Sequence, residues 1–319
     1  MVALLTAGCG LFIGSSDNDA ARSGSVEKAK LKVGVMIGID CTGPQLALLN
    51  DTFKAEGLEI EPVTVQSGAT AMPLLAGGDL DVSFGNWVSF IKAHQAGMAD
   101  LRFISESYLS TPDSNFAVIA GKDSDITGPK DLAGKKVAVN ALKNINELLL
   151  RAVLDANGVD FATVQLVELP FQDMAAAIQN GRVDAAALID PFVSNAQRGR
   201  GARIVFDLTG AGPTENFPLS GFATTRDFTE KNPKTVAAFQ RAVLKGQQLT
   251  AERGNIEKAL PKFAKMDAET AAVVKIGQFP TTIDPKRLQR VADLLVTYGM
   301  LGEKVTMEPL VIPVPPSNG

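Results

Sequence analysis

The apolar positions of this chain follow two alternating patterns from about residue 30 onwards. Short aliphatic runs of strand length alternate with segments whose apolar side chains recur every three to four positions, as on one face of a helix. A strand, helix, strand order predicts parallel sheets joined by right-handed crossovers, and hence an α/β protein. After Asn232 the helical pattern dominates, with helices expected to begin at Pro233 and to cover residues 256–265, 268–278 and 285–298.

One stretch of this alternation occurs twice, which indicates an internal duplication. Residues 67–86 (SGATAMPLLAGGDLDVSFGN) predict a short helix, a glycine stop at Gly78 and an apolar strand that ends in polar residues. Residues 171–190 (FQDMAAAIQNGRVDAAALID) predict the same series, with the stop at Gly181.

The elements on either side of this stretch pair in the same order. The pairs are a strand at 33–35 with one at 137–139, a helix at 44–56 with one at 145–157, a strand at 101–105 with one at 202–207, and a strand at 116–120 with one at 221–225. Chance could explain any single pair. The ordered series predicts two copies of one α/β unit.

The duplication divides the chain into two lobes. We expect each lobe to be a mostly parallel sheet flanked by helices, with two crossover strands joining the lobes. Lobe one comprises residues 31–118 and 215–319, and lobe two comprises residues 119–214. The strands at 116–120 and 221–225 carry the chain across, so the C-terminal helices complete lobe one.

Composition narrows the classes of function. A length of 319 residues suits about two domains, and the 45% apolar and 21% charged content is that of an ordinary soluble protein. A net charge of −4 and a pI near 5.3 give no basic field, so we expect no nucleic-acid partner. The sequence has no apolar run of the length that a spanning helix requires, and two cysteines are too few for a disulfide scaffold.

Residues 1–13 (MVALLTAGCGLFI) are typical of the end of a bacterial lipoprotein signal. The tetrapeptide LTAG precedes Cys9, and such a signal is cut before the cysteine, whose thiol then carries lipid. Residues 14–30 are rich in Ser, Gly, Asp, Asn and Ala, which predicts a flexible tether. Residues 1–30 would thus hold the lobes outside the cytoplasm at a bacterial membrane, without crossing it. The alternative is a hydrophobic N-terminal segment with no signal function.

Six loops are predicted to meet where a ligand would bind. In open parallel sheets, ligands bind beyond the carboxyl ends of the strands, where helix N-termini offer main-chain N–H groups. This rule selects residues 38–43, 67–70 and 85–87 in lobe one, and residues 140–146, 170–173 and 190–192 in lobe two. If the lobes face one another, these loops meet across a cleft.

The candidate ligand-binding residues are mostly polar and uncharged, with aromatic side chains as apolar walls. Amides and hydroxyls offer donors and acceptors, and aromatic rings offer contact area at low entropic cost. The set comprises Asp40, Cys41, Thr42, Ser67, Asn86, Trp87, Tyr108, Asn140, Asn144, Asn146, Asp190 and Phe192. Each has a structural alternative: the asparagines can cap helices, Asp190 can bind local N–H groups, and Trp87 can belong to the core.

Four segments together carry a resemblance to a known family. They are GIDCTGPQLALL, SGATAMPLLAGGDLDVSFGN, DLAGKKVAVNALKNINELLLRAVLDANGVD and AALIDPF. Over about residues 31–300 the chain resembles the nitrate, aliphatic-sulfonate and taurine group of ABC-transporter solute-binding proteins, which has thiamine-pyrimidine-binding relatives. The family often has an aromatic–acidic pair before the final proline and phenylalanine, whereas Ile189 and Asp190 stand here. This departure puts the transfer of a substrate from any relative in doubt.

The resemblance implies a fold and a set of partners. It implies a type II periplasmic-binding-protein fold that captures a small solute between hinged lobes outside the cytoplasm. It also implies delivery to a membrane permease powered by a separate ATPase subunit. We expect the protein to be a monomer.

An enzyme on the same fold is the alternative function, with Cys41 as nucleophile. Related desulfinases and pyrimidine synthases carry reactive side chains in this first strand-end loop. A nucleophilic thiol needs a base or cation nearby, and Lys143 and His94 are the candidates. Other catalytic signatures are missing: GPKDLAGKK at 128–136 does not match a phosphate loop, and His94 is the only histidine. We therefore expect binding without catalysis, no metal and no cofactor.

The charge of the solute stays open in the sequence. Helix N-termini over residues 140–146, with Lys143, suit a sulfonate, nitrate or carboxylate. Asp40 and Asp190 favour a neutral or cationic solute instead, and no arginine falls in the predicted loops. Both a sulfonate-like and a nitrogenous solute remain candidates.

Overall fold

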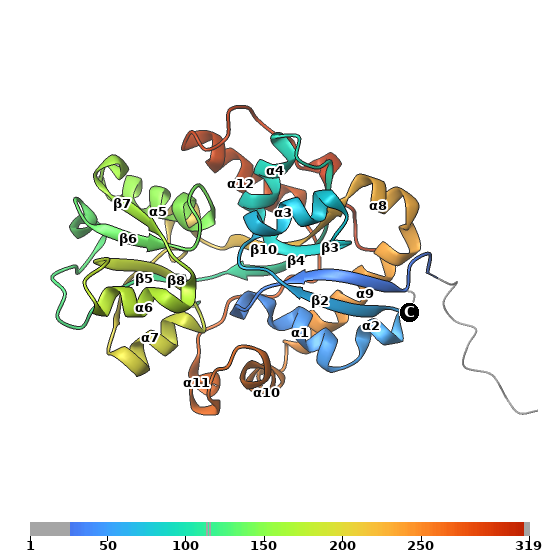
Figure 1. Ribbon diagram of the computed structural model, residues 1–319, viewed down its shortest axis with the longest axis horizontal. Coiled ribbons are helices and arrows are strands. Elements are labelled where there is room, and N and C mark those ends of the chain that lie inside the picture. The colour runs from blue at the N-terminus through green and yellow to red at the C-terminus, as the bar shows by residue number, and fades with distance from the viewer. Residues whose placement is uncertain (1–25, 113, 115, 316–319) are drawn as a thin grey trace, which may run out of the picture.

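The computed structural model describes residues 26–112, 114 and 116–315, which form two five-stranded sheets in two lobes (Figure 1). This confirms the predicted two-lobed α/β class. Cys9, with the signal and most of the proposed tether, lies outside the described residues. Within the part of the chain that is described, no helix is long and apolar enough to cross a membrane.

The sheet of lobe one has four strands that run in one direction and one strand that runs against them. Its order is β2 (Glu59–Thr64), β1 (Lys30–Val35), β3 (Val82–Asn86), β10 (Phe217–Thr225) and β4 (Leu101–Ser110). Strand β1 pairs in parallel with β2 and β3, while β10 runs antiparallel between β3 and β4. The three parallel strands therefore end at one edge, as ligand binding at strand ends requires.

The sheet of lobe two has the same arrangement, and each sheet contains one strand from the crossing connections. Its order is β7 (Gln165–Glu168), β6 (Lys136–Val139), β8 (Ala185–Ile189), β5 (Phe116–Ala120) and β9 (Arg203–Asp207). Strand β5 follows β4 in the chain but pairs with β8 and β9, and β10 follows β9 but pairs in lobe one. The two strands predicted to carry the chain across thus do so, each completing the opposite sheet.

The helices of lobe one cover both faces of its sheet (Figure 1). On one face lie α1 (Thr42–Leu49), α2 (Thr52–Ala55) and α9 (Pro233–Leu249), and on the other lie α3 (Gly68–Gly77), α4 (Trp87–Gln95) and α12 (Pro285–Thr297). Helix α8 (Arg226–Lys231) follows β10 at the outer end of the sheet. Two further helices, α10 (Arg253–Phe263) and α11 (Ala268–Val273), lie below the junction of the lobes in Figure 1.

The helices of lobe two also lie on both faces. Helix α5 (Ile145–Ala156) packs on one face, and α6 (Phe171–Gln179) and α7 (Phe192–Arg200) pack on the other. Short 3-10 turns complete the elements at η1 (Ile39–Cys41), η2 (Pro129–Leu132), η3 (Phe161–Thr163), η4 (Gly212–Thr214) and η5 (Glu308–Leu310). One buried apolar cluster continues between the lobes through Phe90 of α4, Leu149 of α5 and Leu295 of α12.

Both glycine stops of the duplicated stretch are confirmed. Gly78 follows α3 with φ 80°, and Gly181 follows α6 with φ 65°, a left-handed conformation in which a side chain is strained. Two predicted helices differ from the structure. The helix expected over 44–56 breaks at Asp51, which has φ 55°.

The helix expected over 268–278 ends at Val273, and the residues after it are extended. Two main-chain hydrogen bonds join Gln278 to Leu109 of β4, with N···O distances of 2.8 and 2.9 Å. Pairing with a strand distant in sequence has replaced the last helical turns, which a local pattern does not reveal.

The crossing segments meet at buried hydroxyl groups. Ser110, the last residue of β4, lies 2.6 Å from Thr209 between their hydroxyl oxygens, so the two connections touch. The expected lobe boundary at residue 118 falls inside β5, whose residues all pair in the sheet of lobe two. The C-terminal part also reaches lobe two, since Tyr298 donates a 3.2 Å hydrogen bond to Asp155 of α5.

Candidate functional site

A small cavity lies between the lobes at the ends of the parallel strands. We call it the inner cavity; its volume is about 40 Å³. Its lining residues are Met36, Ile37, Asp40, Phe84, Asn86, Phe116, Asn140, Ile145, Asn146, Phe171, Ile189 and Leu219. Both lobes contribute, and four of the six predicted loops have a residue in this wall, namely 38–43, 85–87, 140–146 and 170–173.

Direct hydrogen bonds hold the two lobes against each other around this cavity. The N–H of Ile39 donates to the carbonyl oxygen of Asp190 at 2.9 Å. Lys92 Nζ of α4 donates to the carbonyl oxygen of Lys143 at 2.7 Å. These contacts describe a closed arrangement, in which a solute would be enclosed by both lobes.

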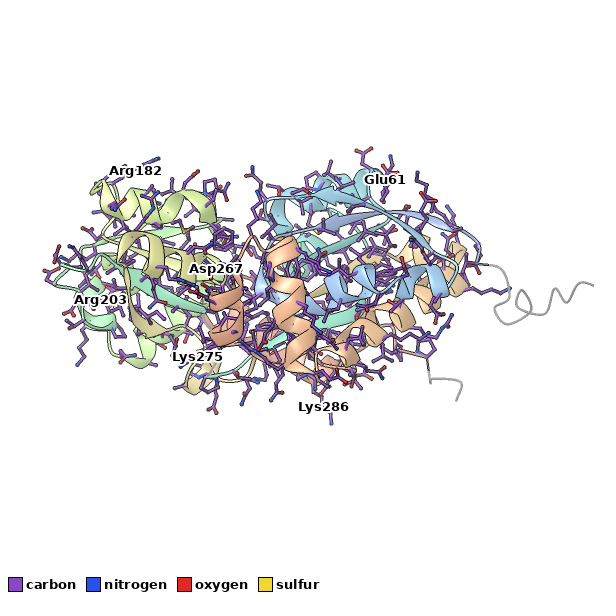
Figure 2. The ribbon with its side chains drawn as sticks, turned by 90° about the horizontal axis from the view of Figure 1, so that it is seen from below. Glu61, Arg182, Arg203, Asp267, Lys275 and Lys286 are labelled. Carbon is purple, nitrogen blue, oxygen red and sulfur yellow. The ribbon has the colours of Figure 1, made fainter. Side chains whose placement is uncertain are left out.

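Ion pairs also close the cleft at a second place. Arg198 of α7 pairs with Asp267 at 2.6 Å and with Glu269 of α11 at 2.9 Å. Figure 2 shows Asp267 at the junction of the lobes. These side chains are largely exposed, so salt screens the interaction strongly.

Asp40 is the one charged residue among the described residues that line the inner cavity. Burial raises the pKa of its carboxyl group to about 6, against a smaller lowering effect of the neighbouring Ser220 hydroxyl. Ser220 Oγ is itself buried and does not reach hydrogen-bond geometry with any described group. The site therefore holds a carboxylate that is costly to keep ionised unless a partner arrives.

The asparagines divide into helix caps and groups that face the cavity. Asn86 Oδ1 accepts from Ser89 N at 2.9 Å and caps α4, and Asn144 Oδ1 accepts from Ile145 N at 2.8 Å and caps α5. The structural alternative therefore holds for both residues. Asn86 also lines the inner cavity, so a cap and a cavity contact coincide there.

Asn146 lines the inner cavity and has an acceptor atom without a partner. Its Nδ2 donates to the carbonyl oxygen of Ala187 at 2.9 Å, which fixes the orientation of the amide. Its Oδ1 is buried and has no hydrogen-bond partner in the described structure, and neither has Oδ1 of Asn140. Unpartnered buried polar atoms at a cavity are the groups that a ligand would satisfy.

A larger outer cavity of about 690 Å³ adjoins the inner one. The two share Met36, Ile37, Asn140 and Phe171 in their walls. Phe171 stacks on Phe192 with ring centroids 5.3 Å apart. The outer wall also contains charged groups, namely Glu168, Arg200 and Lys265.

Several predicted site residues lie elsewhere. Trp87 is fully buried in the core between Phe90 and Phe103, and its Nε1 has no partner among the described groups. The hydroxyl of Tyr108 is buried and accepts a hydrogen bond from Gly277 N. Neither residue lines the inner or the outer cavity.

Four more predicted site residues have local structural contacts. Ser67 caps α3 by accepting from Thr70 N at 3.2 Å, and Thr42 Oγ1 donates to Ile39 O at 2.6 Å. Asp190 is buried, and its Oδ1 accepts from Ser194 N at 2.8 Å in the first turn of α7. Cys41 lines a separate apolar cavity of about 20 Å³, within lobe one.

The chemical setting of Cys41 does not favour a nucleophile. Burial is the main cause that raises the pKa of its thiol well above the ordinary value, and the Asp40 carboxyl adds to the rise. A thiolate is the reactive form, so this environment suppresses reactivity. His94, named as a possible base, accepts from Leu101 N at 3.2 Å at the end of α4.

The apolar walls of the site were missed by the sequence reasoning. Met36, Ile37, Phe116, Phe171 and Leu219 line the inner cavity. The first two directly follow β1, so the strand-end rule could have included them. Phe116 and Leu219 lie on the crossing strands, whose position beside the cavity depends on the exchange between sheets. No group of three or more potential metal ligands occurs among the described residues.

The chain was compared with known proteins. A family model described as NMT1/THI5 like matches residues 40–254. The chain belongs to this family. A putative aliphatic sulfonates-binding protein of Escherichia coli (strain K12) is 30% identical to this NMT1/THI5-like chain over 257 residues, which is 77% of each chain.

Solved structures agree with the fold. The alkanesulfonate-binding protein SsuA from Xanthomonas axonopodis pv. citri, bound to MOPS, has a TM-score of 0.74 at 21% identity, covering 90% of this chain and 99% of its own. The desulfurization enzyme DSZB has a TM-score of 0.67 at 17% identity, covering 90% and 97%. At such identities both likenesses concern the fold alone. The sulfonates-binding relative, at 30% identity, is named as a binding protein, which supports the prediction of binding without catalysis.

Proposed function

We propose that this NMT1/THI5-like protein is the extracytoplasmic solute-binding component of an ABC importer. The observation that carries this function is the meeting of polar residues from both lobes around one cavity, in lobes that exchange the strands β5 and β10 in the described part of the chain. A small organic solute, sulfonate-like or nitrogenous, would bridge the lobes and favour the closed arrangement. The candidate ligand-binding residues that face the inner cavity are Asp40, Asn86, Asn140 and Asn146.

The energetics of closure are within the reach of ordinary affinity. Moving the lobes from mostly open to mostly closed requires about 5.5 kcal/mol of preference for the closed state. A solute bound with micromolar affinity gains about 8 kcal/mol in total. Non-covalent capture is therefore sufficient, and the closed surface can then dock on a permease whose separate ATPase drives transport.

Membrane attachment belongs to the same proposal. The LTAG sequence before Cys9 supports cleavage and lipid modification at that cysteine, and residues 14–30 would act as the tether. Expression in a bacterium with labelled palmitate, followed by membrane fractionation, tests this. We expect label and membrane association in the wild-type chain and neither in Cys9→Ser.

Small-angle scattering with a panel of solutes tests the binding function. The panel contains sulfonates, taurine, nitrate, amines and pyrimidines, and a thermal-shift screen first selects those that stabilise the protein. A solute at a hundred-fold excess over its dissociation constant adds about 2.7 kcal/mol of stability. We expect the selected solute to reduce the radius of gyration of a monomer. A bound solute that leaves the lobe separation unchanged contradicts the proposed function.

A further inference from the structure

The residues that line the inner cavity include acceptor atoms without a hydrogen-bond donor. Asn146 is fully buried, and because its Nδ2 faces the carbonyl oxygen of Ala187, the atom without a partner must be the oxygen. An amide oxygen can only accept, so the solute atom that meets it carries hydrogen. Asn140 Oδ1 is also buried without a partner at the wall that the two cavities share.

The charged side chain that lines the inner cavity is acidic. Asp40 is charged, and no lysine or arginine occurs among the described residues that line this cavity. A sulfonate placed here would meet the carboxylate without a compensating cation. A cation would instead compensate the desolvated carboxylate and satisfy the oxygen of Asn146 at the same time.

Three helix starts nearby are less available to an anion than the sequence implied. Ser89 N in the first turn of α4 is bonded to Asn86 Oδ1, and Ile145 N in the first turn of α5 is bonded to Asn144 Oδ1. Asp190 already accepts from Ser194 N in the first turn of α7. These N–H groups already donate to side chains of the protein and are not free to bind an anion.

The two cavities together set the shape of the solute. A single water needs about 10–15 Å³ of such volume, so the inner cavity of about 40 Å³ admits a small head group. The outer cavity of about 690 Å³ accepts a much larger body. Phe171 lies in both walls, and its stacking on Phe192 offers aromatic surface to that body.

We propose that the solute is an organic cation whose protonated nitrogen, of the amine or amidine type, binds between Asp40 and Asn146. Its apolar or aromatic body extends past Phe171 into the outer cavity. This inference rests on the proposed function and names the class of solute for the same site. It selects the nitrogenous solute over the sulfonate that the names of the relatives suggest.

Matched triplets of probes test the charge of the head group on one body. Benzylammonium, benzyl alcohol and phenylmethanesulfonate form one set, and butylammonium, butanol and butanesulfonate form the other. Titration calorimetry measures each with the wild-type chain and with Asp40→Asn, Asn146→Leu and the control Asp79→Asn, an exposed residue remote from the site. Asp40→Asn keeps the shape of the side chain, so it carries the test if Asn146→Leu does not fold.

We expect the ammonium of each set to bind about ten-fold or more tightly than the alcohol, since hydrogen bonds to charged groups are the stronger ones. We expect no binding of the sulfonates. Asp40→Asn and Asn146→Leu should each weaken the ammonium by about ten-fold, while Asp79→Asn leaves its affinity unchanged. Asp40→Asn should leave the affinity for the alcohol within about two-fold.

Two results would contradict the proposal that the solute is a cation. One is a sulfonate or alcohol that binds as tightly as the ammonium of its set, and the other is an ammonium affinity that does not change in Asp40→Asn. Scattering separates this failure from that of the proposed function. If a sulfonate closes the lobes, the proposal of a cationic solute is wrong while the proposed function stands. If an ammonium binds without closing them, the proposed function is wrong while the proposal of a cationic solute stands.

Discussion

Ser89 Oγ in α4 of lobe one donates a 3.0 Å hydrogen bond to Asn144 Oδ1, the capping oxygen of α5 in lobe two. The start of one helix is thereby joined to the cap of another across the junction of the lobes. Ser89 N is itself bonded to Asn86, which lines the inner cavity. The contact that closes the lobes and the wall of the cavity are thus one hydrogen-bonded unit.

Removal of this contact should favour the open form. In Ser89→Ala the helix caps remain because Asn86 bonds the main chain, and only the bond between the lobes is lost. A neutral hydrogen bond contributes about 0.5–1.5 kcal/mol, so we expect solute affinity to fall by about two- to ten-fold. Calorimetry measures the affinity, and scattering should show a larger mean radius without solute.

Thr297→Ala is the matched control for Ser89→Ala. Thr297 Oγ1 donates to Asp293 O inside α12, an exposed bond within one lobe. Its removal should change neither the affinity nor the radius. An unchanged radius and affinity in Ser89→Ala would show that this bond does not govern closure.

The ion pairs of Arg198 should make closure depend on salt. Arg198 joins α7 to Asp267 and Glu269 beside α11, and all three side chains are largely exposed. Arg198→Gln should open the lobes at low salt, and the difference from the wild type should vanish near 1 M salt, where the Debye length is about 3 Å. Scattering across a salt series measures this. Arg226→Gln, whose partners Glu230 and Asp100 both lie in lobe one, is the control and should show no such dependence.

Asp40 should lower the stability of the empty protein as the pH rises. Its pKa is about 6 in the folded state, above the ordinary 3.8, so between these values the folded state binds more protons than the unfolded state. Its contribution is therefore present below about pH 4 and lost as the pH rises through about 6. Its titratable neighbours Cys41 and Tyr108 stay neutral over this range, because burial raises the pKa values of both groups.

Chemical denaturation from pH 4 to pH 7.5 tests this sign. Relative to the wild type, Asp40→Asn should gain about 1–3 kcal/mol in free energy of unfolding over that range, because one pKa unit corresponds to 1.36 kcal/mol and partial exposure reduces the effect. Asp79→Asn should follow the wild type throughout. A constant difference between Asp40→Asn and the wild type would mean that the carboxyl group titrates normally.

Cys41 should be unreactive in the folded protein, in contrast to the enzyme alternative. Its thiol is buried in the apolar cavity beside Phe53, and burial raises its pKa. In a Cys9→Ser chain we expect iodoacetamide to label Cys41 far more slowly than free cysteine, and at the ordinary rate in denaturant. Mass spectrometry follows the labelling. Rapid labelling of Cys41 in the folded chain would support the alternative that it is a catalytic nucleophile.

The fold was largely predictable because its signals are local and repeated. The glycine stops Gly78 and Gly181 and the apolar strands after them are visible in short windows of sequence, and the structure confirms both. The order of the duplicated elements also implied two sheets of one design. The break at Asp51 and the extended residues before Gln278 were not predictable, because distant contacts outweigh local helical pattern there.

The candidate site was predictable in its loops but not in its chemistry. The strand-end rule selected loops that contain Asp40, Asn86, Asn140 and Asn146, which line the inner cavity, because the rule follows from the direction of parallel strands. It could not separate them from Trp87, Tyr108 and Cys41, whose side chains pack into lobe one. Residue type and position along a strand are local properties, whereas the direction of a side chain at a strand end depends on its neighbours.

The sequence by itself determined the two α/β units, the strands that pass between them and the edge at which we propose that a solute binds, because each follows from the order and direction of the strands. Only the tertiary structure decided that Asn146 offers a free oxygen, because the Ala187 carbonyl that orients its amide comes from β8, distant in the chain. The same packing gives Asp40 its raised pKa. The preference for a cation that we infer is therefore a property of the assembled lobes.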